Sequence, residues 1–512
     1  MSLVRASQYL RFFSAVCAAA FVASCGYRPA HFADRPPVLS EDDEQPIALP
    51  RRGTFIPELH DASVYVRREL VNALEPRRPG EAKDVNALDE VPASSWFRRA
   101  AQVDKPLLGY KREGPPATPF TVTSDAPTSE SPNARVILDA RGRSYELVPD
   151  EPDRRGMRSG AGAAASRLFY AIGYRTAEVH VVTDEGGARF LATRWPPGED
   201  LGPTPIASLR DDDPNDRIEH RDRRSLRALE LAAAWLDLVR LPPRMLRDVY
   251  VGPNGEGHVE HMLVGIDGAL GVTRYDSALA WLRDRDREDS NFFARLFGLG
   301  LSPKRAAYPP DTRNPSLGLY DEFVALGSFS VSPPFEPADR MRAGDAYWMA
   351  KRIASIPQRV LGRAVISTRL PPLAQHALLG LLAARRAQVV AWGYDQVSPL
   401  EPGLVSPPNE ERGYPARVQL VDLAVATGMA SSERASYGAK FSDSEGRVIG
   451  RVAGLRAKNA VVRVEFPEAS RFSDYLVVQV TALRGGRALP HPVELHLQRR
   501  AGELALVGVR HD

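Results

Sequence analysis

Three short segments of the chain carry residue types that could do chemistry, and the first is a glycine motif. Gly160, Gly162 and Ala165 have the G-x-G-x-x-A spacing that lets a pyrophosphate approach the N-terminus of a helix. In such sites the glycines follow a buried strand, whereas the residues before Gly160 are mostly polar and include a proline. A small-residue helix that packs closely is the favoured interpretation, and nucleotide binding at this motif is the alternative.

The second and third segments are a histidine pair and an acidic run. His258 and His261 would share one face of a helix, but their segment has the pattern of a strand, where residues three apart face opposite sides. The run at 211–216 could bind calcium, but its proline and its spacing favour a solvated turn. The sequence also lacks the motifs of serine hydrolases, zinc proteases and P-loop enzymes. We therefore predict no metal site and no cofactor.

Both cysteines of the chain, Cys17 and Cys25, lie near its N-terminus. Arg5 and Arg11 precede an apolar run at 12–22, which is too short to span a bilayer comfortably. The run ends in the sequence VASC, which resembles the lipobox of bacterial lipoproteins. An ordinary secretory signal with a chance cysteine is the alternative interpretation.

The lipobox resemblance implies a location and a membrane partner. Residues 1–24 would be a signal peptide, and acyl chains on Cys25 would anchor the mature protein in the cell envelope. Gly26 stands where an Asp would favour the inner membrane, so the resemblance implies the outer membrane. The mature chain would then hold no free thiol and no disulfide, and it must fold by hydrophobic packing alone.

Charge and composition exclude some partners. The net charge is only +3, from 67 basic and 64 acidic residues that are interspersed, so we expect no nucleic-acid partner. No later apolar run reaches transmembrane length. With 43% hydrophobic residues over 512 positions, the chain can build two or three domains.

The pattern along the chain predicts an α+β protein. Strands are expected at 134–138 and 144–148, helices at 62–74, 161–172 and 223–239, a hairpin turn at 252–255, and a helix opening at Pro372. Period-2 patterning after Pro407 predicts an all-β sandwich or barrel. The predicted divisions are a signal peptide (1–24), a flexible tether (25–56), a helical and extended segment with a long loop (57–133), a mixed domain (134–405) and a β domain (412–512).

The stretch 86–97, NALDEVPASSWF, resembles the DEVPDSSWF motif of uncharacterised proteobacterial envelope proteins. The segments 168–173, 212–216 and 492–497 are similar to that family as well. Its intact members resemble distant protein kinases of the HipA and spore-coat type. The resemblance implies a two-lobed body with a strand lysine, a helix acid, a catalytic-loop Asp and Asn, and a metal-binding Asp in a DFG-like turn.

This chain departs from the family at each of those positions. In the order just given, the aligned residues are Val148, Gly162, Arg240, Met245 and Gly265. None of them can neutralise phosphate, hold Mg²⁺ or orient a nucleophile as its counterpart does. The sequence also has no lysine between Lys111 and Lys304. Arg143, Asp248 and Asp267 remain as the candidates for a residual pocket.

These observations favour a degenerate, non-catalytic kinase-like body that acts as a binding or scaffolding module. Its expected partners are the membrane, through the lipid anchor, and envelope proteins or polymers. The alternative is a divergent Mg²⁺-dependent phosphotransferase that uses Asp248 and Asp267.

Overall fold

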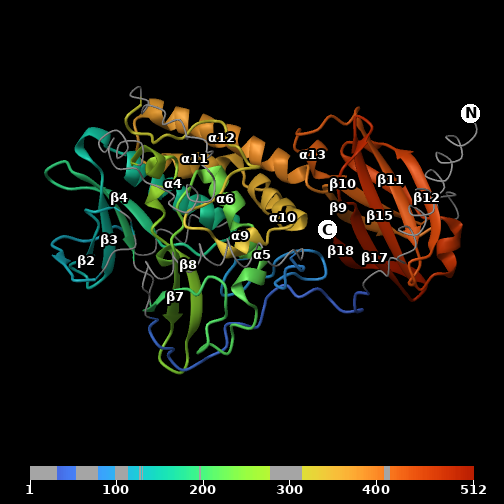
Figure 1. Ribbon diagram of the computed structural model, residues 1–512, viewed down its shortest axis with the longest axis horizontal. Coiled ribbons are helices and arrows are strands. Elements are labelled where there is room, and N and C mark those ends of the chain that lie inside the picture. The colour runs from blue at the N-terminus through green and yellow to red at the C-terminus, as the bar shows by residue number, and fades with distance from the viewer. Residues whose placement is uncertain are drawn as a thin grey trace, which may run out of the picture. The chain divides into compact units, whose positions relative to one another are not determined.

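A computed structural model describes most of the chain (Figure 1). The described residues are 31–53, 79–98, 114–125, 129, 131–194, 198–276, 314–408 and 416–511. They form two compact units: a larger unit, with residues of 38–86 and 90–396, and a C-terminal unit, with residues of 31–37, 87–89 and 397–511. The predicted signal peptide, Cys25 and the predicted helix at 62–74 lie outside the described residues.

The larger unit contains a five-stranded antiparallel sheet with one helix packed against it. The strand order is β1-β2-β3-β5-β4. The strands are β1 (Thr121–Val122), β2 (Arg135–Leu138), β3 (Ser144–Pro149), β4 (Val179–Thr183) and β5 (Arg189–Arg194). Helix α4 (Met157–Ile172) connects β3 to β4, and Gly173 ends it with a φ of 135°. Alanines and glycines make α4 narrow, so it approaches the sheet closely.

The rest of the larger unit is a small sheet and a group of helices. Strands β6 (Glu199–Pro203), β7 (Leu246–Val251) and β8 (His258–Leu263) form an antiparallel sheet, and the predicted turn at 252–255 joins β7 to β8. The helices are α5 (Arg224–Arg227), α6 (Leu229–Leu236), α9 (Glu336–Asp339), α10 (Ala343–Ala354), α11 (Gln358–Ile366) and α12 (Pro372–Tyr394). Short 3-10 turns complete the unit: η2 (Pro152–Arg154), η3 (His220–Asp222), η4 (Pro243–Met245) and η5 (Ile266–Gly268).

The C-terminal unit is a β-sandwich. One sheet has the order β13-β14-β10-β9, and the other has the order β12-β11-β15-β17-β18, with β16 paired to β15. Its elements are β9 (Leu400–Ser406), β10 (Arg417–Asp422), α13 (Leu423–Ala426), β11 (Ala435–Ser442), β12 (Val448–Leu455), β13 (Ala457–Lys458), β14 (Val461–Glu465), η6 (Glu468–Phe472), β15 (Tyr475–Arg484), β16 (Arg487–Ala488), β17 (Val493–Arg500) and β18 (Glu503–Arg510).

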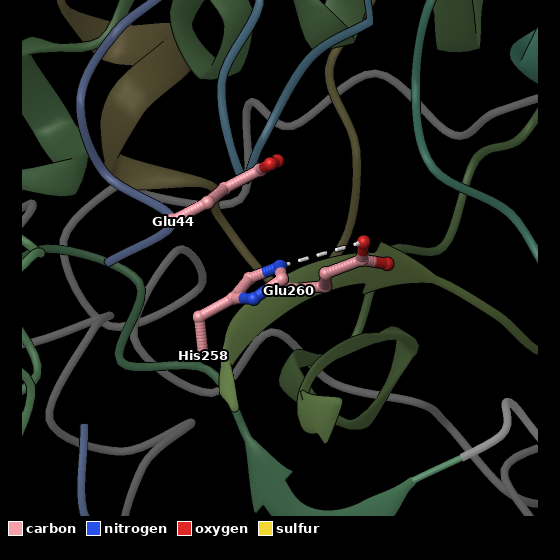
Figure 2. A group of neighbouring side chains, drawn as sticks. All are labelled: Glu44, His258 and Glu260. Atoms are coloured by element: carbon pink, nitrogen blue, oxygen red, sulfur yellow. Dashed lines mark ion pairs between the residues drawn. The ribbon is translucent and has the colours of Figure 1, made fainter. Parts of the chain in front are cut away.

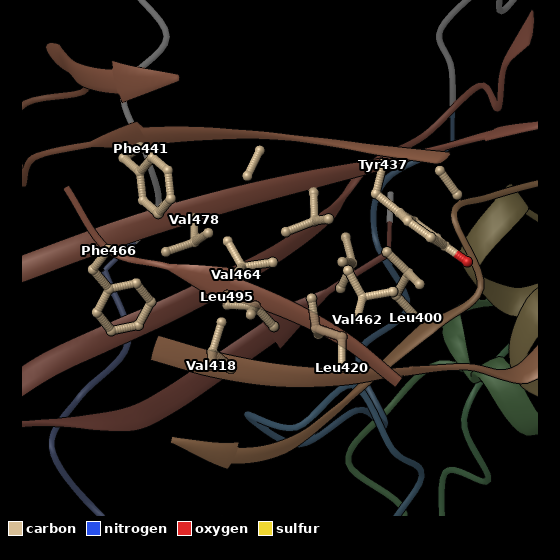
Figure 3. Packing of buried hydrophobic residues seen from close by; sticks show 14 of the residues in the cluster. Leu400, Val418, Leu420, Tyr437, Phe441, Val462, Val464, Phe466, Val478 and Leu495 are labelled. Carbon is tan, nitrogen blue, oxygen red and sulfur yellow. The ribbon is translucent and has the colours of Figure 1, made fainter. Parts of the chain in front are cut away.

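The two sheets of this sandwich share one apolar core (Figure 3). Val418 and Val462 come from one sheet, and Phe441, Val478 and Leu495 come from the other. All five side chains are fully buried. The sequence pattern predicted either a sandwich or a barrel. The described strands form two sheets that do not close into a barrel, so the domain is a sandwich.

The α+β class is confirmed by these helices and antiparallel sheets. Strand β3, helix α4, the loop after α6 and turn η5 also follow one another in the order that the kinase-like resemblance implies. No described helix is long and apolar enough to cross a bilayer.

Three segments differ from the sequence interpretation in detail. Residues 31–53 belong to the predicted tether and are mostly exposed, but Ile47 is buried with Tyr250 in a small core cluster. The predicted helix at 223–239 is split into α5 and α6 and ends at Asp237, whose φ is 49°. Strand β9 pairs with β10 although it precedes the expected start of the β domain. The sequence interpretation did not include it because Pro402 and Gly403 interrupt the strand pattern.

Candidate functional site

The strand position of the family lysine lies inside an apolar cluster. Val148 of β3 is 1% exposed and packs with Ala163 of α4 and Leu191 of β5. An ammonium group at this place would have no aqueous exit within the cluster. An aliphatic side chain therefore occupies the position that the sequence resemblance aligned with the strand lysine.

Gly162 of α4 faces turn η5 with no space for a side chain. A Cβ atom on this residue would lie 2.3 Å from Cδ2 of Leu191 and 3.3 Å from Cα of Asp267. The helix and the turn are thus in backbone contact at the position of the family's helix acid. A carboxylate cannot be placed there without moving one of the two elements.

The acid of turn η5 is Asp267, two residues after the aligned position. Gly265 precedes the turn with a φ of 64° and supplies no side chain. Asp267 is 2% exposed, and its Oδ2 accepts hydrogen bonds from Arg158 Nη1 at 2.9 Å and from Ser129 Oγ at 2.8 Å. An arginine of α4 therefore neutralises the one carboxylate of this turn.

Arg158 joins two acids of this region. It forms ion pairs with Asp267 and with Asp276, and these acids raise its pKa although burial opposes the charged form. The backbone N–H of Ser129 donates to Oε1 of the buried Glu146 on β3 at 2.9 Å. Ser129 is thus bonded both to β3 and to η5 and connects the two elements.

The loop after α6 places the two remaining aligned residues. Arg240 forms a parallel bridge with Ser332, and Met245 is 2% exposed within η4. Neither has the carboxylate or amide that its family role requires.

The sequence analysis missed Asp237, three residues before Arg240. It is fully buried, and its Oδ1 lies 2.8 Å from Arg274 and 3.2 Å from Arg385. Burial raises its pKa against the effect of these arginines. The loop is joined to the turn that follows η5, because Leu270 N–H donates to the carbonyl oxygen of Leu236 at 2.7 Å. A register slip of three residues in the alignment would have found this acid.

Asp248 belongs to a different set of side chains. It is fully buried on β7, and it is bonded to Thr204, to Arg210 at 2.9 Å and to Nδ1 of His261 at 2.7 Å. These partners outweigh burial and lower the pKa of Asp248 to about 2. Asp267 is bonded instead to Ser129 and Arg158, so among the described residues no shared partner joins the two acids of the alternative phosphotransferase hypothesis.

Arg143, the third candidate for a residual pocket, stabilises the turn between β2 and β3. Its Nη2 donates to Oδ2 of Asp139 at 2.9 Å and to the carbonyl oxygen of Pro115 at 3.0 Å. These bonds close the turn between β2 and β3. Arg143 thus acts on the hairpin rather than on Asp248 or Asp267.

The motif at 86–97 has a structural role. The indole of Trp96 stacks on the imidazole of His261, with 3.7 Å between the ring centroids, and packs edge-on against His220, with 4.4 Å between the centroids. His220 in turn is bonded to Asp216 at 2.7 Å. Buried histidines, each bonded to a buried aspartate, therefore surround Trp96. The sequence alone could not predict this cluster, because its members are distant in the chain.

The described residues contain one group of three side chains that could together ligate a metal ion. It consists of Glu44, His258 and Glu260 (Figure 2), and it includes neither Asp248 nor Asp267. His258 and His261 do separate as the strand pattern predicted, since His261 bonds to Asp248 while His258 lies beside Glu260.

Comparison with solved structures finds matches that include three kinase structures. The Helicobacter pylori proinflammatory kinase CtkA is matched over 54% of this chain and 95% of its own, at 10% identity and a TM-score of 0.33. The Golgi casein kinase is matched over 68% and 94%, at 9% identity and a TM-score of 0.28. Its structure with Mn/ADP bound is matched over 71% and 94%, at 8% identity and a TM-score of 0.28.

These scores are too low to place any residue of this chain on a kinase residue. No family model and no curated protein matches the chain. The roles of Asp237 and Asp267 must therefore be argued from their own surroundings.

Proposed function

We propose that this chain is a non-catalytic, kinase-like binding or scaffolding module. One observation carries the proposal: the carboxylate of Asp267 is bonded to Arg158 and Ser129 of the same chain. Phosphoryl transfer requires that carboxylates at this place bind Mg²⁺ and that a nearby cation binds phosphate. Here the acid is already neutralised, and Val148 stands at the aligned position of the cation.

A divergent phosphotransferase remains the second candidate because of one contact. The bond between Leu270 and Leu236 holds the loop of Asp237 beside the turn of Asp267, so two buried acids stand on neighbouring segments. Each of these acids is paired with arginine, which favours the non-catalytic role.

A phosphoryl-transfer assay separates the two candidates. The mature chain is incubated with labelled ATP and Mg²⁺, alone and with a general protein substrate, beside Asp267→Ala. The proposal expects no labelled product above that of the variant. Transfer by the native chain that Asp267→Ala abolishes would establish the phosphotransferase.

We also propose that the protein is anchored through Cys25 in the cell envelope, at the outer membrane, and that its partners are envelope proteins or polymers. The support is the basic and apolar N-terminus ending in VASC. Cell fractionation of Cys25→Ala tests the anchor, with Cys17→Ala as the matched control. The first variant should lose processing and membrane association, and the second should keep both. Unchanged behaviour of Cys25→Ala would contradict the proposal.

A further inference from the structure

Glu44, His258 and Glu260 are spaced as ligands rather than as hydrogen-bonding partners. One ligand atom from each lies within 4.8 Å of the others. Nε2 of His258 is 3.8 Å from Oε1 of Glu260, which is too far for a hydrogen bond. Nitrogen and oxygen atoms that share one Zn²⁺ at about 2.0 to 2.2 Å stand roughly 3 to 4 Å apart. Figure 2 shows the imidazole and the Glu260 carboxylate near each other, with Glu44 above them.

The backbone fixes these three residues independently of any metal. His258 and Glu260 are two apart on β8, so their side chains project from the same face of the sheet. Glu44 lies on a segment held at both ends, because Glu41 N–H bonds to the carbonyl of Ala93 at 2.7 Å and Ile47 N–H bonds to that of Gly257 at 2.8 Å. The cluster is therefore preformed.

His258 supplies the observation that points to a ligand. Its Nε2 is buried and has no hydrogen-bond partner among the described residues. A buried polar nitrogen without a partner is costly unless something else satisfies it. The side chain as a whole is 21% exposed and that of Glu44 is 46% exposed, so an ion can reach the group from solvent.

Arg175 is the competing cation. Its Nη1 is 2.5 Å from Oε1 of Glu260, and its Nη2 is 2.6 Å from Oε1 of Glu44. The guanidinium neutralises both carboxylates but leaves Nε2 of His258 without a hydrogen-bond partner among the described residues. A divalent ion would satisfy all three groups, and it would have to displace one or both arginine contacts.

We propose that Glu44, His258 and Glu260 form a binding site for a divalent transition metal of the zinc class, with Arg175 weakening its affinity. One imidazole and two carboxylates are ligands typical of Zn²⁺, whereas Mg²⁺ prefers oxygen ligands and water. The bound ion clamps the segment around Glu44 onto β8. This inference does not depend on the proposed function, since it shares no residue with the region around Asp267.

Calorimetric titration of the mature chain with ZnCl₂ in a non-chelating buffer tests the proposal. We expect one bound equivalent of Zn²⁺, no comparable binding of MgCl₂, and visible absorption bands of a low-symmetry site when Co²⁺ replaces Zn²⁺. His258→Gln should weaken Zn²⁺ binding at least tenfold, and it leaves the Arg175 ion pairs in place. Glu44→Gln, at an exposed position, should weaken it as well.

Two further variants sharpen the result. Arg175→Gln should strengthen Zn²⁺ binding severalfold, because the competing charge is gone. His180→Gln is the matched control, since His180 is a half-buried strand histidine that contacts only one carboxylate of the described residues, that of Glu178 at 2.8 Å. Equal affinity in the native chain, His258→Gln and Glu44→Gln, or no Zn²⁺ binding by the native chain, would overturn the proposal.

Discussion

The Cα atom of Asp267 in η5 lies 3.3 Å from the place that a Cβ on Gly162 in α4 would occupy. Helix and turn are therefore packed backbone to backbone, and Arg158, one turn earlier on the same helix, reaches the Asp267 carboxylate. The position that the sequence resemblance aligned with a helix acid is thus closed sterically. The acid that remains is neutralised by the same helix.

This packing predicts opposite effects for two alanine substitutions on one helix. Gly162→Ala should lower the free energy of unfolding by about 1 to 3 kcal/mol, because its Cβ overlaps Leu191 and presses on Asp267. Gly160→Ala should be neutral or stabilising by up to about 1 kcal/mol, because its Cβ meets only Leu370 at 3.4 Å. Urea unfolding of both variants measures the difference. A tolerated alanine at Gly162 would show that α4 and η5 are not tightly packed.

The buried Asp248 predicts a loss of stability in acid. Its pKa is lowered from 3.8 to about 2 in the folded protein, so the unfolded chain takes up a proton first as the pH falls. Its contribution is complete above about pH 4 and is lost as the pH falls through about 2, and a shift of this size corresponds to about 2 kcal/mol. Urea midpoints at pH 6, 4 and 3 measure it.

Asp248→Asn should flatten this pH dependence and lower stability at pH 6, since Arg210 and His261 would lose their carboxylate. Asp443→Asn is the control, because Arg447 lowers the pKa of Asp443 on an exposed turn. Asp216, whose pKa His220 also lowers against the effect of burial, keeps part of the acid dependence in both variants. The same pH dependence in Asp248→Asn and the native chain would contradict the role given to Asp248.

Much of the fold could be predicted from local sequence patterns. Period-2 burial in β10 and β14 and the turn between β7 and β8 follow the sequence pattern. Strand β9 was hidden by Pro402 and Gly403, which lower strand propensity although the strand pairs with β10.

The site depends on contacts that no local pattern reports. Arg158 bonds to Asp267, which is 109 positions away in the sequence, and Arg385 bonds to Asp237, which is 148 positions away. Arginine and aspartate are common on protein surfaces, so the presence of these residue types in a sequence does not predict a buried ion pair. Asp237 and Asp267 stand three and two positions before and after Arg240 and Gly265, the residues that the resemblance aligned.

The role of β9 predicts where the C-terminal unit can be cut. Residues 397–512 should give a β-type circular-dichroism spectrum and unfold cooperatively. Residues 412–512 lack the β9 ladder and the fully buried Leu400, whose loss costs about 2 to 5 kcal/mol. Thermal unfolding of the two fragments compares them. Equal midpoints, or a helical spectrum for the longer fragment, would contradict the assigned sandwich.

Calorimetric titration of residues 26–512 with ATP in the presence of Mg²⁺ tests the central claim most directly. The non-catalytic account predicts no metal-dependent binding in the micromolar range, because Arg158 occupies the Asp267 carboxylate and Val148 replaces a phosphate-binding cation. Asp267→Ala should give the same flat titration. Micromolar, Mg²⁺-dependent binding by the native chain that disappears in Asp267→Ala would contradict the account.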